Sequence, residues 1–131
     1  MRELKLPKVS EFESSFGNYL GENIYCRAVS NGTAALHMAL LALGVGKGDE
    51  VITVCNSFYA TVGAIVACGA TPILVDCDER YQINVEEIKR VFTKKTKAIL
   101  PVHWGGASPN MEAINKIAKR RGLIVIEDAC M

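Results

Sequence analysis

The chain has 131 residues, half of them hydrophobic and 22% charged, which is the composition of a folded protein and excludes a disordered tail. Its 15 basic and 14 acidic residues leave a net charge of +1, so neither nucleic acid nor a membrane is indicated as a partner. The longest mostly apolar stretch, residues 34–45, is too short to span a bilayer. Since no apolar signal segment opens the sequence, we expect a cytoplasmic protein.

In chain order, the sequence alternates between helices and short apolar strands. Ser10, with Glu13 three residues later, has the spacing of a capping box and predicts a helix from about Glu11 to residues 20–21. Strands are predicted at residues 25–29, 51–54, 71–75, 98–102 and 123–127. Further helices are predicted at residues 32–43, 57–68, 84–92 and 108–122.

Capping residues mark the ends of the last two helices. Asn84, with Glu87 three residues later, is predicted to begin the first of them. Ser108 and Pro109 suit the N-cap and the first helical position of the second, and Gly122 suits its C-terminal end.

The strands lack polar alternation, so both faces of their sheet should be covered by helices. Their spacing along the chain is that of βα units, which join parallel strands through right-handed crossovers. The sequence therefore predicts an α/β fold with three layers, α/β/α, around a mainly parallel sheet. Residues 1–131 are expected to form one domain.

Five cysteines are present, and they contain no CxxC pair and no metal-ligand spacing. An odd number also argues against a disulfide framework. We therefore predict no metal site and reduced thiols, mostly in the core, at Cys26, Cys55, Cys68, Cys77 and Cys130.

Ligands of open α/β sheets bind beyond the carboxyl ends of the strands. Five places in this sequence meet that condition: residues 30–34, 55–58, 76–78, 103–106 and 128–131. In the first, Gly32 allows close approach of a ligand, Thr33 offers a hydroxyl, and the first helical turn aims its N–H groups at an anion. The residues alone fit a phosphate site and a simple capped turn equally well.

The other four places also allow two interpretations each. Asp128 either caps a following element or supplies a counter-charge for a protonated ring nitrogen. Phe58 fits the core better than stacking on a planar ligand when it is considered alone. For His103 a structural hydrogen bond is favoured over catalysis, and for Asp76 and Asp78 loop solvation and capping are favoured over a metal.

Taken together, these features resemble the DegT/DnrJ/EryC1/StrS family of pyridoxal 5′-phosphate (PLP) dependent sugar aminotransferases, which have the fold-type I architecture. The resemblance is carried by residues 29–36 (VSNGTAAL) and 125–129 (VIEDA), and by shorter segments at residues 12–21, 48–52, 58–61, 69–72, 75–76, 96–99 and 101–103. A cysteine desulfurase or an amino-acid lyase of the same fold type fits the glycines at residues 105–106 less well.

The resemblance implies a role for each of these residues. Gly32, Thr33 and Ala34 would hold the PLP phosphate, Phe58 would stack on the pyridine ring, and Asp128 would pair with the ring nitrogen. The reaction implied is transfer of an amino group from glutamate to a keto group of a nucleotide-linked deoxysugar. The product would serve cell-surface polysaccharide or related amino-sugar biosynthesis.

The sequence also departs from the family pattern. In the family, the lysine that binds PLP covalently lies downstream of the aspartate, whereas this sequence ends at Met131. The family also has a glutamine three residues after the aspartate, and that position is Met131 here. We therefore expect a large domain truncated at both ends, without the C-terminal small domain and without a catalytic residue. Transamination and dehydration both stay open, as does an inactive truncated or split module that binds PLP weakly. In the fold-type I sheet the first strand lies beside the last ones, which this chain lacks. The resemblance therefore implies that the strand at residues 25–29 has no neighbour, and we expect aggregation, a homo-oligomer (a dimer in the family) or completion by a second chain.

Overall fold

The computed structural model describes residues 7–131, which form two compact units. The first unit ends at Ser30 and the second begins at Asn31. The first unit contains helix α1, Pro7–Leu20, followed by an irregular segment. Ser10 lies within this helix, so the predicted capping box is wrong.

Glu13 binds the segment that follows α1 instead of capping the helix. Its Oε1 accepts a hydrogen bond of 2.9 Å from the Ala28 amide, and its Oε2 lies 3.0 Å from Nη1 of Arg27. The Ala28 bond, supported by Arg27, lowers the pKa of the Glu13 carboxyl. The predicted strand at residues 25–29 is absent, and Tyr25 is 92% exposed. Strands are stable only within a sheet, and none of the four strands in residues 7–131 pairs with this segment.

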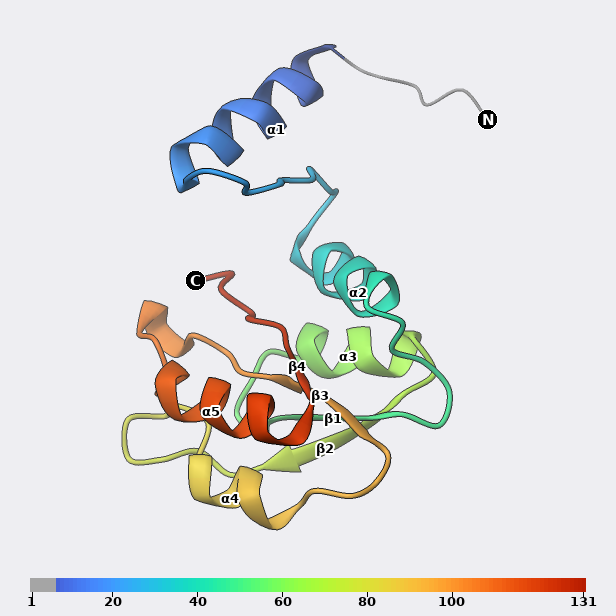
Figure 1. The fold of residues 1–131 in the computed structure, drawn as a ribbon, viewed down its shortest axis with the longest axis vertical. Helices are drawn as coiled ribbons and strands as arrows, with labels where there is room; N and C mark the ends of the chain where they lie inside the picture. Colours follow the sequence, from blue (N-terminus) through green and yellow to red (C-terminus); the bar gives the residue numbers. More distant parts are fainter. Residues whose placement is uncertain (1–6) are drawn as a thin grey trace. The chain divides into compact units, whose positions relative to one another are not determined.

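The second unit is built on a four-stranded parallel sheet of order β2-β1-β3-β4 (Figure 1). The strands are β1 at Glu50–Val54, β2 at Thr71–Val75, β3 at Thr96–Leu100 and β4 at Ile124–Val125. A further parallel bridge joins Val102 to Asp128 beyond β3 and β4. The parallel sheet predicted from the apolar runs is confirmed.

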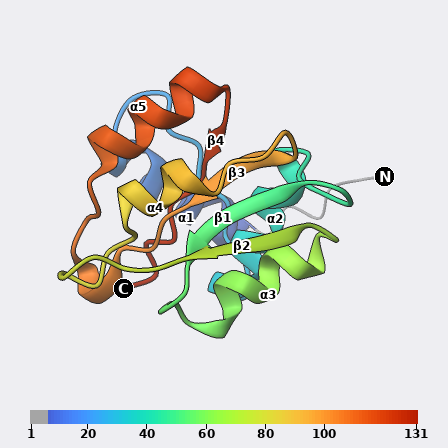
Figure 2. The ribbon, with the colours of Figure 1, turned by 90° about the horizontal axis from the view of Figure 1, so that it is seen from below.

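Helices cover both faces of this sheet, as predicted (Figure 2). Helices α2, Gly32–Ala42, and α3, Tyr59–Ala67, lie on one face, and α4, Val85–Arg90, and α5, Met111–Arg121, lie on the other. Successive strand residues point to opposite faces. In β3, accordingly, Ala98 and Leu100 pack in the cluster that includes α2 and α3, while Ile99 packs in the cluster that includes α4 and α5.

For the last two helices, the predicted ends are confirmed in two cases and wrong in one. Asn84 caps α4 by accepting a 3.0 Å bond from the Glu86 amide, and Gly122 ends α5 with φ +66°. At the start of α5, however, Asn110 is the N-cap, accepting 3.1 Å from the Ala113 amide. Ser108 instead donates to the Pro109 carbonyl. Ser108 and Asn110 both have side chains suited to an N-cap, and the prediction that Ser108 fills this role is wrong.

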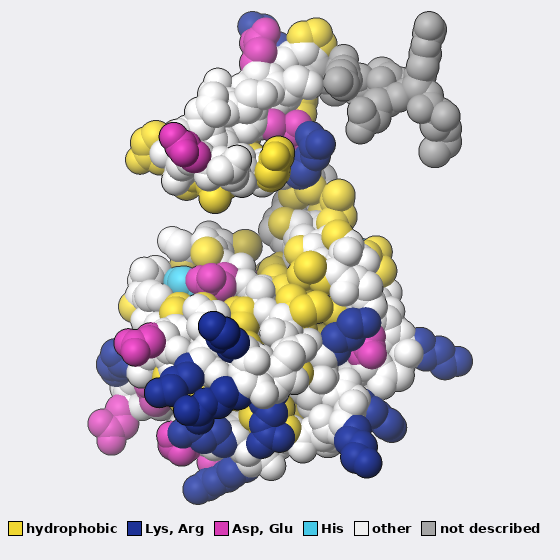
Figure 3. Space-filling model, viewed as in Figure 1, with side chains coloured by type: hydrophobic (Ala, Val, Ile, Leu, Met, Phe, Trp, Pro, Cys, Tyr) yellow, Lys and Arg dark blue, Asp and Glu magenta, His cyan; other side chains and the backbone are white. Residues whose placement is uncertain are grey.

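Basic residues gather on the face of the second unit that α4 and α5 cover (Figure 3). The last turns of these helices carry Lys89, Arg90, Lys119, Arg120 and Arg121. Cations at helix C-termini interact favourably with the helix dipole. Of the helices in residues 7–131, none combines the length and the apolar character needed to cross a bilayer.

The cysteine prediction is partly wrong. All five thiols are free, but none is fully buried, and Cys55 and Cys130 are exposed. Small apolar side chains near strand ends look like core residues in the sequence. In the structure these two lie where the chain leaves the sheet.

Asp49 links the turn before β1 to β3. Its Oδ2 accepts 2.9 Å from the Gly46 amide and 3.1 Å from Nζ of Lys97, and these bonds lower the pKa of its carboxyl below the ordinary 3.8. The carboxylate therefore stabilises the fold above pH 3.8, and this contribution is lost as the pH falls through the folded-state pKa. We expect Asp49→Asn to cost about 1 kcal/mol at pH 7, and less as the pH falls toward 3.

Urea unfolding at several pH values measures this difference, with the exposed Glu79→Gln as the control for loss of one charge. A cost that stays constant between pH 7 and pH 3 would contradict the assigned role of the Asp49 carboxylate.

Candidate functional site

A pocket of about 320 Å³ lies beyond the carboxyl ends of the strands of the second unit. Four of the five predicted places contribute to its wall, and residues 76–78 do not. The lining comes from the start of α2, the segment after β1, the segment after β3 and the chain's last residues: Asn31, Gly32, Thr33, Leu36, Ser57, Phe58, Ala60, Val102, Trp104, Asp128, Cys130 and Met131.

The N-terminus of α2 forms one side of the pocket. Asn31 caps the helix by accepting 2.9 Å from the Ala34 amide, and its carbonyl accepts 3.1 Å from the Ala35 amide. Gly32 and Thr33 precede that first intrahelical bond and line the pocket. Ala34 does not line it, and its amide is engaged by the cap. The turn is therefore a capped helix start whose positive dipole end faces the pocket.

Asp128 forms another side, and it is only 7% exposed. The Thr61 hydroxyl donates to its Oδ2 at 2.7 Å, while its Oδ1 receives a longer contact of 3.4 Å from the Cys130 amide. Its backbone is held within the sheet, because its amide donates to the Pro101 carbonyl and its carbonyl accepts from the His103 amide. This is a buried carboxylate aimed at a pocket, with a hydroxyl partner on one oxygen.

Phe58 is the N-cap residue of α3 and is 63% exposed, so the interpretation as a core residue is wrong. Its ring contacts that of Tyr59, with centroids 4.3 Å apart. An exposed aromatic face at the mouth of a pocket is suited to stacking on a planar ligand.

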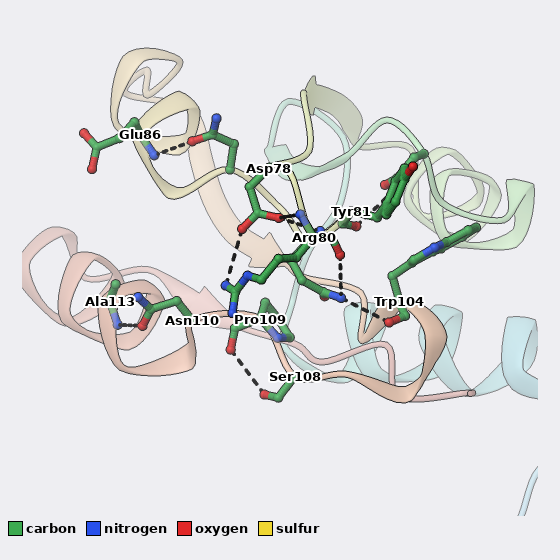
Figure 4. Close-up of polar contacts among 12 residues, drawn as sticks. Asp78, Arg80, Tyr81, Glu86, Trp104, Ser108, Pro109, Asn110 and Ala113 are labelled. Atoms are coloured by element: carbon green, nitrogen blue, oxygen red, sulfur yellow. Dashed lines mark hydrogen bonds and ion pairs between the residues drawn. The ribbon is translucent and has the colours of Figure 1, made fainter.

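The side chain of Asp78 makes hydrogen bonds within its own loop (Figure 4). Oδ1 of Asp78 accepts from the amides of Arg80 and Gln82 at 2.9 and 3.0 Å. Gln82, which is 2% exposed, donates from Nε2 to the Trp104 carbonyl at 3.0 Å and so supports the pocket wall. Asp78 thus binds amides of its own loop, whereas the favoured prediction for Asp76 and Asp78 was loop solvation and capping. The contact from Gln82 to Trp104 has no signal in the sequence.

His103 does not line the pocket, and its Nε2 lies 2.8 Å from Oε2 of Glu127. The favoured prediction of a structural hydrogen bond is thus confirmed. Among residues 7–131, no group of three or more His, Cys, Asp or Glu side chains could hold a metal ion.

Gly32 and Cys130 approach each other closely at the pocket. A Cβ atom at Gly32 would lie 2.6 Å from Sγ of Cys130, so an added methyl group must displace that thiol. Cys130 is itself held by Asp128, whose hydrogen bond, with burial, raises the pKa of the thiol.

We expect Gly32→Ala to cost up to about 1 kcal/mol of folding free energy through this clash, since the sulfur belongs to an exposed side chain that can shift. In a Cys130→Ala background the cost should largely vanish, because the clashing sulfur is gone. Urea unfolding of the four proteins of this double-mutant cycle measures the coupling. Equal costs in both backgrounds would show that the two residues do not meet.

Comparisons with known proteins match this chain along almost its whole length. The family model described as the DegT/DnrJ/EryC1/StrS aminotransferase family matches residues 4–131. GDP-perosamine synthase of Caulobacter vibrioides is 43% identical over 122 residues, which are 92% of this chain and 33% of that protein. The chain thus spans about a third of the length of this curated relative.

Solved structures give the same result. NtdA from Bacillus subtilis, with bound cofactor PMP, has a TM-score of 0.92 and 44% identity, over 96% of this chain and 29% of that one. DesV of S. venezuelae has a TM-score of 0.89 and 37% identity, over 94% of this chain and 33% of that one. The chain therefore belongs to the DegT/DnrJ/EryC1/StrS aminotransferase family.

Proposed function

We propose that this chain carries part of the PLP site of a sugar aminotransferase. The enzyme would move an amino group from glutamate to a keto group of a nucleotide-linked deoxysugar, for cell-surface polysaccharide or related amino-sugar biosynthesis in the cytoplasm. The observation that best supports this proposal is that a helix N-terminus, an exposed aromatic ring and a buried carboxylate all line one pocket.

These groups suit the charges of PLP. The positive end of α2, formed by Gly32, Thr33 and Ala34, would hold the phosphate, with Ala34 acting through the helix because its amide is engaged by Asn31. Phe58 would stack on the ring. Asp128 would accept a hydrogen bond from the protonated ring nitrogen, which offsets the cost of its burial.

When bound, PLP supplies an electron-withdrawing ring that stabilises negative charge on the substrate carbon. Asp128 serves this chemistry by holding a proton at the ring nitrogen. The apolar wall from Leu36, Ala60 and Val102 keeps water from that contact. We propose that the chain forms part of a PLP-binding large domain, either within a homo-oligomer, such as a dimer, or completed by a second chain.

Calorimetric titration with pyridoxamine 5′-phosphate (PMP) tests the proposal. PMP is the suitable probe because its amine cannot form a covalent bond to a lysine, and no lysine lines the described pocket. We expect one PMP per chain, and at least about tenfold weaker binding of pyridoxamine, which lacks the phosphate. Absence of binding, or equal affinity for the two ligands, would refute the proposed site.

A second experiment tests whether a lysine of this chain binds PLP covalently. The chain is incubated with sub-stoichiometric PLP and reduced with borohydride, and the labelled lysines are located by peptide mapping. We expect scattered labelling of exposed lysines such as Lys94, Lys95 and Lys119. One dominant adduct would mean that these 131 residues supply their own covalent lysine. No PMP binding together with scattered labelling would favour a non-catalytic module that pairs with another chain.

A further inference from the structure

Two hydroxyl groups, those of Thr61 and Ser57, are hydrogen-bonded in series to the carboxylate of Asp128. Thr61, in the first turn of α3, is fully buried, and its Oγ1 lies 2.7 Å from Oδ2 of Asp128. Oγ of Ser57 lies 2.6 Å from Oγ1 of Thr61 on the other side. These contacts join the segment after β1 to the end of the chain, across 67 positions of sequence.

The direction of the hydrogen bonds follows from the number of protons. An ionised carboxylate can only accept, so the single proton of the Thr61 hydroxyl is donated to Asp128. The oxygen of Thr61 then accepts from Ser57, whose hydroxyl is the donor of that pair. The result is a directed series from Ser57 to Thr61 to Asp128. Hydrogen bonds to a charged acceptor are stronger than neutral ones, and burial from water strengthens this one further.

The backbone of Thr61 is fixed in the first turn of α3, because its amide donates to the carbonyl of Phe58 at 3.1 Å. Its side chain is therefore held in place while its hydroxyl binds Asp128. Carboxylate torsions are broad, so without this bond Asp128 could rotate about its last side-chain bond.

We propose that Thr61 is a positioning residue that, supported by Ser57, fixes Oδ2 of Asp128 and presents Oδ1 to the ring nitrogen of a bound pyridine cofactor. Oδ1 accepts the long 3.4 Å contact from the Cys130 amide, and the Cys130 thiol also hydrogen-bonds to this carboxyl. A carboxylate oxygen accepts more than one hydrogen bond, so Oδ1 retains acceptor capacity for a ligand. Partners behind a binding group orient it, and their loss weakens binding although they never touch the ligand. This inference rests on the proposed function of the pocket.

The test compares Thr61→Val, which keeps the shape and removes the hydroxyl, with Thr61→Ser, which keeps the hydroxyl. Affinities are measured by calorimetry for PMP and for its 1-deaza analogue, in which a CH group replaces the ring nitrogen. We expect Thr61→Val to weaken PMP binding about tenfold and Thr61→Ser by less than about twofold. Binding of the 1-deaza analogue should be the same in the wild-type chain and in Thr61→Val, because it has no nitrogen for Oδ1.

Thermal unfolding of each variant identifies any general damage to the fold. If Thr61→Val does not fold, Ser57→Ala carries the same test, with an expected loss of about threefold for PMP alone. Unchanged PMP affinity in the folded variants, or an equal loss for both ligands, would overturn the positioning role and leave the proposed site intact. A wild-type chain that does not bind PMP would overturn the proposed function and this inference with it.

Discussion

Replacing Asp128 with asparagine is expected to weaken PMP binding by about 100-fold, because the change removes the charge opposite the ring nitrogen from a desolvated position. The carboxylate is 7% exposed, so water screens it little. The asparagine oxygen can still accept from Thr61, which keeps the local packing. Calorimetric titration of the 131-residue chain measures the effect.

The neighbouring acid provides a matched control. Glu127→Gln makes the same chemical change one residue earlier, at a side chain that is 48% exposed and pairs with His103 outside the pocket. It should leave PMP affinity within about twofold. Similar losses in the two variants would indicate a general charge effect and would argue against a specific contact at Asp128.

Leu40→Ala is expected to lower the free energy of unfolding by about 3 kcal/mol. Leu40 is fully buried on the face of α2 that packs against the sheet, in the cluster that includes Val51 and Leu100. Truncation there removes apolar contact and leaves a cavity in a packed interior. Urea unfolding monitored by far-UV circular dichroism measures the change.

Leu41→Ala makes the identical substitution at the next position of the same helix, where the side chain is 52% exposed. We expect a cost of less than about 1 kcal/mol, since little contact is lost. Comparable costs at the two positions would mean that the packed face of α2 has been assigned wrongly.

The parallel sheet could be predicted from the sequence because its signal is local. Each of the four observed strands contains a short apolar run that follows a helix, and in β1 and β3 burial on both faces leaves no polar alternation. The strand predicted at residues 25–29 had the same local signal but failed. A strand is stabilised by its neighbour, and residues 25–29 have no neighbouring strand in the described structure.

The helix starts show how competing local signals mislead. Ser10 with Glu13 has capping-box spacing, yet Ser10 lies within α1 and Glu13 binds the Ala28 amide, fifteen residues away. Asn110 caps α5 although Ser108 and Pro109 had suitable identities. Residue identity at a given spacing therefore indicates a possible cap but does not decide where the helix starts.

Most of the pocket wall could be located because parallel strands end at one edge of the sheet. This rule correctly predicts that Phe58 and Asp128 lie near one another. Gly32 also lines the pocket, although the strand predicted before it, at residues 25–29, is absent from the described structure. The residues behind the wall could not be found in this way. Thr61 and Gln82 act through contacts with Asp128 and Trp104, and nothing local in the sequence separates them from ordinary helix and loop residues.

Binding of the phosphate and ring of a pyridine cofactor in the pocket is tested most directly by ¹H–¹⁵N NMR of the labelled 131-residue chain during titration with PMP. We expect saturable shifts that are largest at the amides of Gly32, Thr33, Phe58 and Asp128. Shifts centred elsewhere, for example on the basic face near Lys119 and Arg121, or no saturable shifts at all, would contradict it.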